Sequence, residues 1–263
     1  MGHRIWLAKA SIFVALLFFG AACATMSSTS SAKKPLTKTE RARLLVEVAN
    51  GALLEGDPIG ALQDLAKAEA EDPKLPEIYH SKALAYHAKR DLKRALVEAR
   101  HAVKLFPPYA EANNTLGKLL IDAGQYEEAV SPLLVAADNP LFRDAYKALT
   151  NLGILYYRRG QLEQSLRYLN RAIESEPQVA CIAYYYRGHL RLKGARFKDA
   201  ARDYDLATRK YCGGFADAHL ALGIAYEQSR QFDLARKKFL EIQQRYPDTR
   251  IAEQAMSHLR YLP

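Results

Sequence analysis

The residues of this 263-residue chain that could do chemistry are few and widely separated. Cys23, Cys181 and Cys212 are its three cysteines, and its seven histidines are scattered. His80 and His87 would lie about 10–11 Å apart along a helix, whereas two ligands of one metal ion usually stand three or four residues apart. No Gly-rich phosphate loop, HExxH motif, CxxC pair or nucleophile beside a base is present. We therefore expect no enzymatic activity, no metal, no cofactor and no small-molecule substrate.

The first 23 residues have the pattern of an export signal that ends at a cysteine. Arg4 and Lys9 come before the apolar run Ala10–Gly20, which has the length of a signal-peptide core and is short for a bilayer span. The small residues before Cys23 resemble a bacterial lipobox, although Gly20 stands where an aliphatic residue is usual. We expect acylation of Cys23. The alternative is an ordinary cleaved signal in which this cysteine has no role.

The residues around this cysteine predict an anchored protein. Residues 1–22 would be the signal peptide, and residues 23–39, rich in Ser, Thr and Lys, would form a flexible tether. By the sorting rules of such lipoproteins, Ala24 after the cysteine permits transfer to the outer membrane. We expect the protein to be held by its lipid at the periplasmic face of that membrane.

Small residues stand at regular intervals through the rest of the chain. These residues recur every 34–36 positions, at Ala61, Ala95, Ala129, Ser165, Ala200 and Ala235. A period of about 34 residues is the signature of tetratricopeptide repeats, each of which is a helix, a turn and a second helix. The chain resembles that class, which implies an all-α, right-handed superhelix of about six helical hairpins.

The regular spacing of these small residues divides one domain, residues 40–263, into repeats. The expected repeats are 42–75, 76–109, 110–143, 146–179, 181–214 and 216–249, followed by a capping helix at 250–262. Prolines near the end of most repeats favour the end of the second helix, because proline cannot continue a helix. The last helix would cover the final apolar face, as repeat arrays require for solubility.

Cys181 and Cys212 fall at the first and thirty-second positions of the fifth repeat. The start of the first helix and the end of the second lie side by side in a helical hairpin. The two thiols are therefore expected at the open end of one hairpin, where they can form a disulfide in an oxidising compartment. The alternative is a pair of buried free thiols.

The concave groove of such a superhelix is the expected binding surface, and the alternative is binding by the convex face or the edges. Positions 2, 5, 9 and 12 of each first helix line the groove and combine aliphatic and aromatic side chains with neutral hydrogen-bonding groups. They suit an extended segment, or a helix with an apolar face, better than a highly charged ligand. Among the adjacent tyrosines of the fifth repeat, we expect Tyr185 to face the groove and Tyr184 and Tyr186 to pack inside. The expected groove residues are Asn50, Leu53, His80, Leu84, His87, Asn114, Lys118, Ile121, Thr150, Ile154, Tyr157, Tyr185, His189 and Leu192.

The net charge of +9 does not by itself indicate a nucleic-acid partner. Basic residues are spread along the helices near acids, as Arg158 and Arg159 are near Glu163, and no basic stripe is interleaved with aromatic residues. We expect a solvated surface and no nucleic-acid binding.

Repeats behind a lipoprotein signal resemble the pilotins, the outer-membrane lipoproteins of type IV pilus assembly. The segment 129–153, AVSPLLVAADNPLFRDAYKALTNLG, resembles their junction between third and fourth repeats, and Cys181 and Cys212 resemble a cysteine pair of some members. The resemblance implies a non-enzymatic protein that binds the secretin subunit of the pilus and, through its lipid, promotes secretin localisation and multimerisation at the outer membrane, which pilus biogenesis and twitching motility require.

A second resemblance lies near the C-terminus. The segment 239–259, FLEIQQRYPDTRIAEQAMSHL, is similar to the last repeat of lipoproteins in the β-barrel assembly machinery and of cell-envelope coordinators. It implies an alternative function as a scaffold for barrel insertion or envelope constriction.

Overall fold

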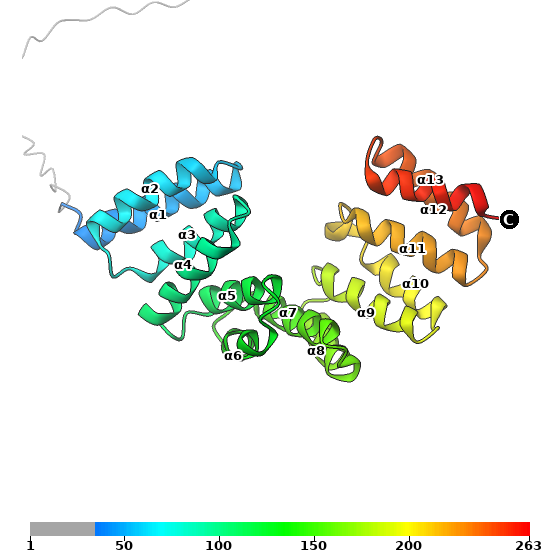
Figure 1. Ribbon diagram of the computed structural model, residues 1–263, viewed down its shortest axis with the longest axis horizontal. Helices are drawn as coiled ribbons and strands as arrows, with labels where there is room; N and C mark the ends of the chain where they lie inside the picture. Colours follow the sequence, from blue (N-terminus) through cyan, green and yellow to red (C-terminus); the bar gives the residue numbers. More distant parts are fainter. Residues whose placement is uncertain (1–34) are drawn as a thin grey trace, which may run out of the picture. The chain divides into compact units, whose positions relative to one another are not determined.

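The computed structural model describes residues 35–263, and Leu36–Pro263 forms one compact unit. Every regular element within these residues is a helix, and the helices follow one another in antiparallel pairs (Figure 1). The predicted all-α fold is confirmed. The predicted signal peptide, the lipidation site Cys23 and most of the predicted tether lie outside the described residues.

Six helical hairpins and a last single helix make up the array. The first helices of the hairpins are α1 Lys38–Leu54, α3 Pro76–Ala88, α5 Ala110–Asp122, α7 Ala145–Arg158, α9 Cys181–Lys193 and α11 Ala216–Gln228. The second helices are α2 Pro58–Glu71, α4 Leu92–Leu105, α6 Tyr126–Ala137, α8 Leu162–Ser175, α10 Phe197–Leu206 and α12 Phe232–Arg245, and α13 Arg250–Tyr261 ends the array. None of the helices in this described part is both long and apolar enough to cross a membrane.

Local signals in the sequence set where several helices begin and end. Thr37 and Glu40 form a capping box at the start of α1, and the carboxylate of Asp57 accepts hydrogen bonds from the first free N–H groups of α2. Gly124 and Gly160 adopt positive φ in the turns between paired helices, a conformation that costs glycine little. These caps and turns make each hairpin short and antiparallel.

A second series of small residues, twelve positions before Ala129, Ser165, Ala200 and Ala235, has a direct packing explanation. A Cβ atom placed on Gly117 would lie 2.3 Å from the Leu133 side chain, and one on Gly188 would lie 2.5 Å from the Tyr204 ring. Only glycine fits there, because the bulky residue of the second helix occupies the space beside the first helix. The same relation holds for Gly153 with Leu169 and for Gly223 with Phe239.

Neighbouring hairpins stack to form a continuous core. In its central part Leu119, Leu133, Leu152 and Leu155 are almost completely buried, although they belong to different hairpins. At the far end α13 packs on α11 and α12 and buries Ala255. The array thus builds its core from contacts between neighbours along the chain.

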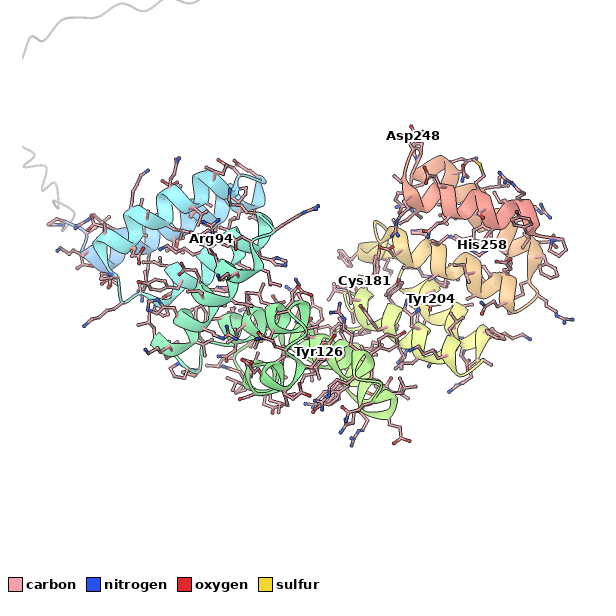
Figure 2. The ribbon with its side chains drawn as sticks, in the orientation of Figure 1. Arg94, Tyr126, Cys181, Tyr204, Asp248 and His258 are labelled. Atoms are coloured by element: carbon pink, nitrogen blue, oxygen red, sulfur yellow. A yellow bond between two sulfur atoms is a disulfide. The ribbon has the colours of Figure 1, made fainter. Side chains whose placement is uncertain are left out.

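The fifth hairpin departs from the pattern of the others. Its second helix, α10, ends at Leu206, and a short 3₁₀ helix, η1 Lys210–Cys212, follows before α11. The expected register had placed this stretch at the end of an ordinary second helix. The early end leads the chain back toward the start of α9, where Cys181 lies (Figure 2).

Candidate binding groove

The first helices of the hairpins carry the residues expected to line the groove, and three hollows open along them. The hollow over α1 and α3, here the first groove section, has a volume of about 480 Å³ and is lined by Val46, Asn50, Leu53, Leu54, His80 and Leu84, among others. The aliphatic side chains that line this section differ in their exposure. Val46 is buried, whereas Leu54 is 91% exposed and Leu84 is 38% exposed.

The polar groups of the first groove section already bond to one another. The hydroxyl of Ser81 donates to Asn50 Oδ1 at 2.7 Å. The ring of His80 lies within hydrogen-bond distance of the Tyr109 hydroxyl at 3.2 Å and of Thr115 Oγ1 at 2.9 Å. Burial lowers the pKa of His80 to about 4, so the ring is neutral near pH 7. This part of the groove therefore offers apolar contact and neutral polar groups, and Arg43, Glu47 and Glu77 add charge of both signs to its lining.

The second groove section lies over α5, α7 and the start of α9 and has a volume of about 330 Å³. The side-chain amide of Asn151 donates to Asn114 Oδ1 at 2.9 Å, so two asparagines join α7 to α5. Thr150 is buried, and its hydroxyl donates to the Tyr146 carbonyl oxygen at 2.7 Å. Its hydroxyl is therefore used inside α7 and is not free for a ligand.

The third groove section continues from the second toward α11 and has a volume of about 620 Å³. Apolar lining comes from isoleucines and aromatic rings, and charge of both signs stands at its edges. The residues that line it include Lys118, Ile121, Asp122, Asn151, Ile154, Arg158, Ile182, Tyr185, Tyr186, Phe215 and Asp217. A mixed rim of this kind suits a partner with an apolar contact surface and no large net charge.

The aromatic rings of the third groove section pack mainly against one another. Tyr185 has its ring centroid 4.9 Å from Phe215, 4.4 Å from His189 and 5.6 Å from Tyr186. Burial raises the pKa of Tyr185 to about 12. The Tyr204 hydroxyl lies 2.9 Å from His189 Nδ1 and ties the cluster to α10.

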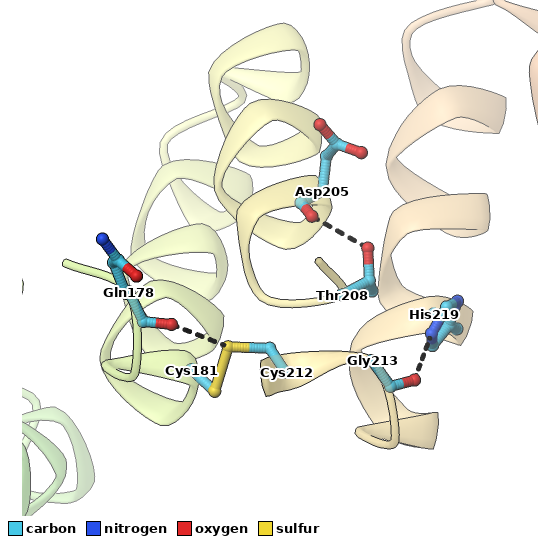
Figure 3. The surroundings of a disulfide bond; sticks show 7 residues. All are labelled: Gln178, Cys181, Asp205, Thr208, Cys212, Gly213 and His219. Carbon is cyan, nitrogen blue, oxygen red and sulfur yellow. Dashed lines mark hydrogen bonds between the residues drawn. A yellow bond between two sulfur atoms is a disulfide. The ribbon is translucent and has the colours of Figure 1, made fainter. Parts of the chain in front are cut away.

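A disulfide joins Cys181 and Cys212, four residues before Tyr185 and three before Phe215 (Figure 3). The two Cα atoms are 5.5 Å apart, and the bond joins the first residue of α9 to the last residue of η1. Cys181 itself lines the second and third groove sections. Phe215 follows three residues after Cys212, so the bond holds the segment that brings Phe215 beside Tyr185.

Most of the expected groove residues line one of the three sections, and four do not. The residues that line a section are Asn50, Leu53, His80, Leu84, Asn114, Lys118, Ile121, Thr150, Ile154 and Tyr185. The other four are occupied by contacts nearby: His87 beside Lys118, Tyr157 and His189 in the aromatic cluster, and Leu192 against the core of the fifth hairpin.

Several lining residues were not among those expected. Tyr186 lines the third groove section with Tyr185, so the expectation that it packs only inside is wrong. Asn151, Ile182 and Phe215 also line this section and were not expected. Ile182 stands at position 2 of its repeat, which is one of the lining positions, although it was not named. Asn151 and Tyr186 directly follow an expected position, so a wider stripe would have found these two. Phe215 lies in a connection that depends on the disulfide.

The described residues contain no group of three or more His, Cys, Asp or Glu side chains that could hold a metal ion. The candidate site is the groove formed by the three sections. Its chemistry consists of apolar faces, amide groups and a few charges at the rim.

Comparison with known proteins gives the same repeat class. Models of the tetratricopeptide repeat match residues 146–179 and 185–249. The type IV pilus assembly protein PilF of Pseudomonas aeruginosa is 26% identical over 246 residues, which cover 90% of this chain and 95% of that protein. The chain contains tetratricopeptide repeats and is similar to PilF over most of its length.

Two solved structures show that tetratricopeptide-repeat fold over most of the chain. The structure of Pseudomonas aeruginosa PilF matches with a TM-score of 0.72 at 22% identity and covers 84% of this chain and 99% of that one. PilW, a widely conserved type IV pilus biogenesis factor, matches with a TM-score of 0.72 at 19% identity and covers 82% and 98%. The predicted superhelix of tetratricopeptide hairpins is thus confirmed.

Proposed function

We propose that this protein is a non-enzymatic factor of type IV pilus biogenesis that binds another protein along its groove. The observation that carries the proposal is the match to PilF, which spans nearly the whole of both chains. The groove supports a binding role, since exposed aliphatic side chains lie beside amide groups over several consecutive hairpins.

The partner we propose is the secretin subunit of the pilus. An extended segment or an amphipathic helix of that subunit would place its apolar side chains against Leu54, Leu84 and Ile182, which are exposed in the free protein. Neutral polar groups such as Asn50 and Asn114 would face the polar atoms of the segment. Recognition of this kind gains its affinity from apolar contact and its direction from hydrogen bonds.

We further propose that acylated Cys23 holds the protein at the periplasmic face of the outer membrane. Several acyl chains anchor far more firmly than one. A secretin subunit bound to an anchored protein is concentrated at the membrane where the ring must assemble. The mechanism is therefore recognition followed by localisation, with no covalent step on the partner.

A Cys23→Ala variant tests the anchoring step. We expect the variant to fold and to capture secretin in vitro as the parent chain does, while secretin multimers fail to form at the outer membrane. Normal multimer assembly in cells that carry this variant would rule out anchoring as the mechanism.

Deletion of the gene separates this function from the alternative scaffold role in barrel assembly or envelope coordination. We expect the loss of surface pili and twitching motility while other outer-membrane proteins keep their levels. A broad loss of porins would support the barrel-assembly function instead.

A further inference from the structure

Two neighbouring loops between hairpins expose apolar side chains that the groove does not use. One follows α4 and carries Phe106, which is 50% exposed, with Pro107 and Pro108. The other follows α6 and carries Pro140 and Leu141, and Leu141 is 89% exposed. Both loops connect one hairpin to the next, so they lie at the same edge of the array. We call these five residues the apolar edge.

Short contacts hold the two loops together and fix their shape. The side-chain amide of Asn139 donates to the Pro108 carbonyl oxygen at 3.3 Å, and its Oδ1 atom accepts from the Leu141 N–H at 2.9 Å. Phe142 is buried in a small cluster with Ala110 and other residues. Phe142 therefore anchors the loop inward, and the adjacent Leu141 is held outward.

The backbone of the apolar edge has no free N–H group to desolvate. Three of its five residues are prolines, which lack a donor. The Phe106 N–H donates to the Ala102 carbonyl oxygen at 3.0 Å, and the Leu141 N–H is bonded to Asn139. Unbonded N–H and C=O groups both oppose the transfer of a loop into an apolar medium, and the N–H part of that cost is absent here.

Positive charge flanks the apolar edge. Lys104 and Arg143 are exposed and take part in no salt bridge within residues 35–263. Among the acids nearby in the chain, Asp144 pairs with Lys147 at 2.6 Å and Asp138 pairs with Arg171 at 3.6 Å. Glu111 is exposed and in no salt bridge within residues 35–263, so two unpaired cations stand against one unpaired acid. Cations beside exposed apolar side chains favour a surface with an apolar interior and anionic headgroups.

We propose that the apolar edge inserts into the headgroup region of a phospholipid bilayer that contains anionic lipid. Phe106 and Leu141 would enter the boundary between headgroups and acyl chains, and Lys104 and Arg143 would remain at the phosphate level. The contact would orient the array on the membrane. It is separate from the groove and does not depend on secretin binding.

A bilayer fits this edge better than a protein does, because the tips protrude and offer no pocket. A protein partner would need a matching cavity, whereas lipid adapts to any protruding side chain. The opposite edge provides a matched comparison. There Leu54 ends α1 with 91% exposure and stands at a turn within a hairpin.

A fluorescent label tests the proposal on the whole chain. Leu141→Cys and Leu54→Cys variants would be labelled with acrylodan and reconstituted into vesicles of phosphatidylcholine with or without phosphatidylglycerol. The unsubstituted chain, labelled in parallel, gives the background from Cys23. We expect emission from position 141 to shift to shorter wavelength in the anionic vesicles, with no such shift from position 54.

Two further measurements decide the source of the shift. Adding Phe106→Ser to Leu141→Cys should reduce it, with an unchanged circular dichroism spectrum. An absent shift at position 141, or an equal shift at position 54, would overturn the proposal. So would a shift at position 141 that appears only when secretin is added, since the edge would then contact protein. Secretin binding by the groove is tested by a separate binding measurement, so that proposal can hold or fail whichever of these results is obtained.

Discussion

The first and third groove sections use similar positions on the first helices but differ in how much of their side chains remains exposed for contact with a partner. In the first section Asn50 and Ser81 are bonded to each other, while Leu54 and Leu84 remain exposed. In the third section Tyr185 and Tyr186 face other rings, and a disulfide ties the start of α9 to η1. Aromatic residues at groove positions are therefore not automatically free for a partner.

This difference separates the residues that stabilise the fold from the residues that can contribute to binding. Apolar area that the protein already buries contributes to its own folding, and only area still exposed can be removed from water by a partner. The third section should thus be the more sensitive to substitutions that loosen the fold. The exposed aliphatic residues of both sections should be the more sensitive in binding.

The largest expected effect is the loss of the disulfide. In the double variant Cys181→Ser, Cys212→Ser, a link between residues 31 apart is removed, and the chain-entropy model predicts a loss of about 3–4 kcal/mol in the free energy of unfolding. Hydrogen exchange should show faster opening of α9, η1 and α11 and little change in α1 and α3. Equal acceleration in both regions would contradict a local role for the bond.

Acid should next weaken the first section through His80. Its pKa is about 4 in the folded protein, below the value of about 6.5 for an exposed histidine. Between about pH 4 and pH 6.5 the unfolded chain therefore binds a proton at this residue that the folded chain does not. The stability from a neutral His80 is complete above about pH 6.5 and decreases as the pH falls to about 4, by at most roughly 3 kcal/mol.

Denaturant titrations across this pH range check the prediction. A His80→Gln variant, which cannot titrate there, should show a flatter dependence than the parent chain. Burial also lowers the pKa of His189 and of His219, so a smaller dependence of the same sign should remain in the variant. If the two proteins lose stability in parallel, His80 is not the source.

Alanine substitutions at two glycines should have smaller effects on stability, opposite in sign. A Gly188→Ala change places a Cβ atom 2.5 Å from Tyr204 and should cost about 1–3 kcal/mol, since the ring or the helix must move. Gly51→Ala in α1 meets no atom within 4 Å and should stabilise its helix by up to about 1 kcal/mol. Thermal unfolding measures both. A stabilised Gly188→Ala protein would show that the third section is not tightly packed.

The sequence predicted the fold because its packing rule is local and repeated. Glycine at one helix position and a bulky residue sixteen positions later, as with Gly117 and Leu133, report the same contact in several hairpins. The fifth hairpin was harder to predict, because α10 ends early at Leu206 and a non-repeating segment then brings Cys212 to the distant Cys181.

The groove was predicted in outline and not in its details. Helical spacing finds residues that point to the same side, such as Asn50 and His80. It does not reveal that Thr150 turns its hydroxyl back to the Tyr146 carbonyl, or that His189 bonds to Tyr204. Phe215 escaped prediction because a non-repeating connection positions it.

Binding of purified secretin subunit to three charge variants tests the central claim most directly. Leu84→Glu changes the first groove section and Ile182→Glu the second and third, while Val97→Glu changes an exposed residue of α4 outside all three. Each variant must first unfold at the temperature of the parent chain. We predict that the dissociation constant rises at least about tenfold for the two groove variants, equivalent to about 1.4 kcal/mol, and stays the same for Val97→Glu. Unchanged binding by both groove variants, with a loss in Val97→Glu, would place the partner on another face and contradict the account.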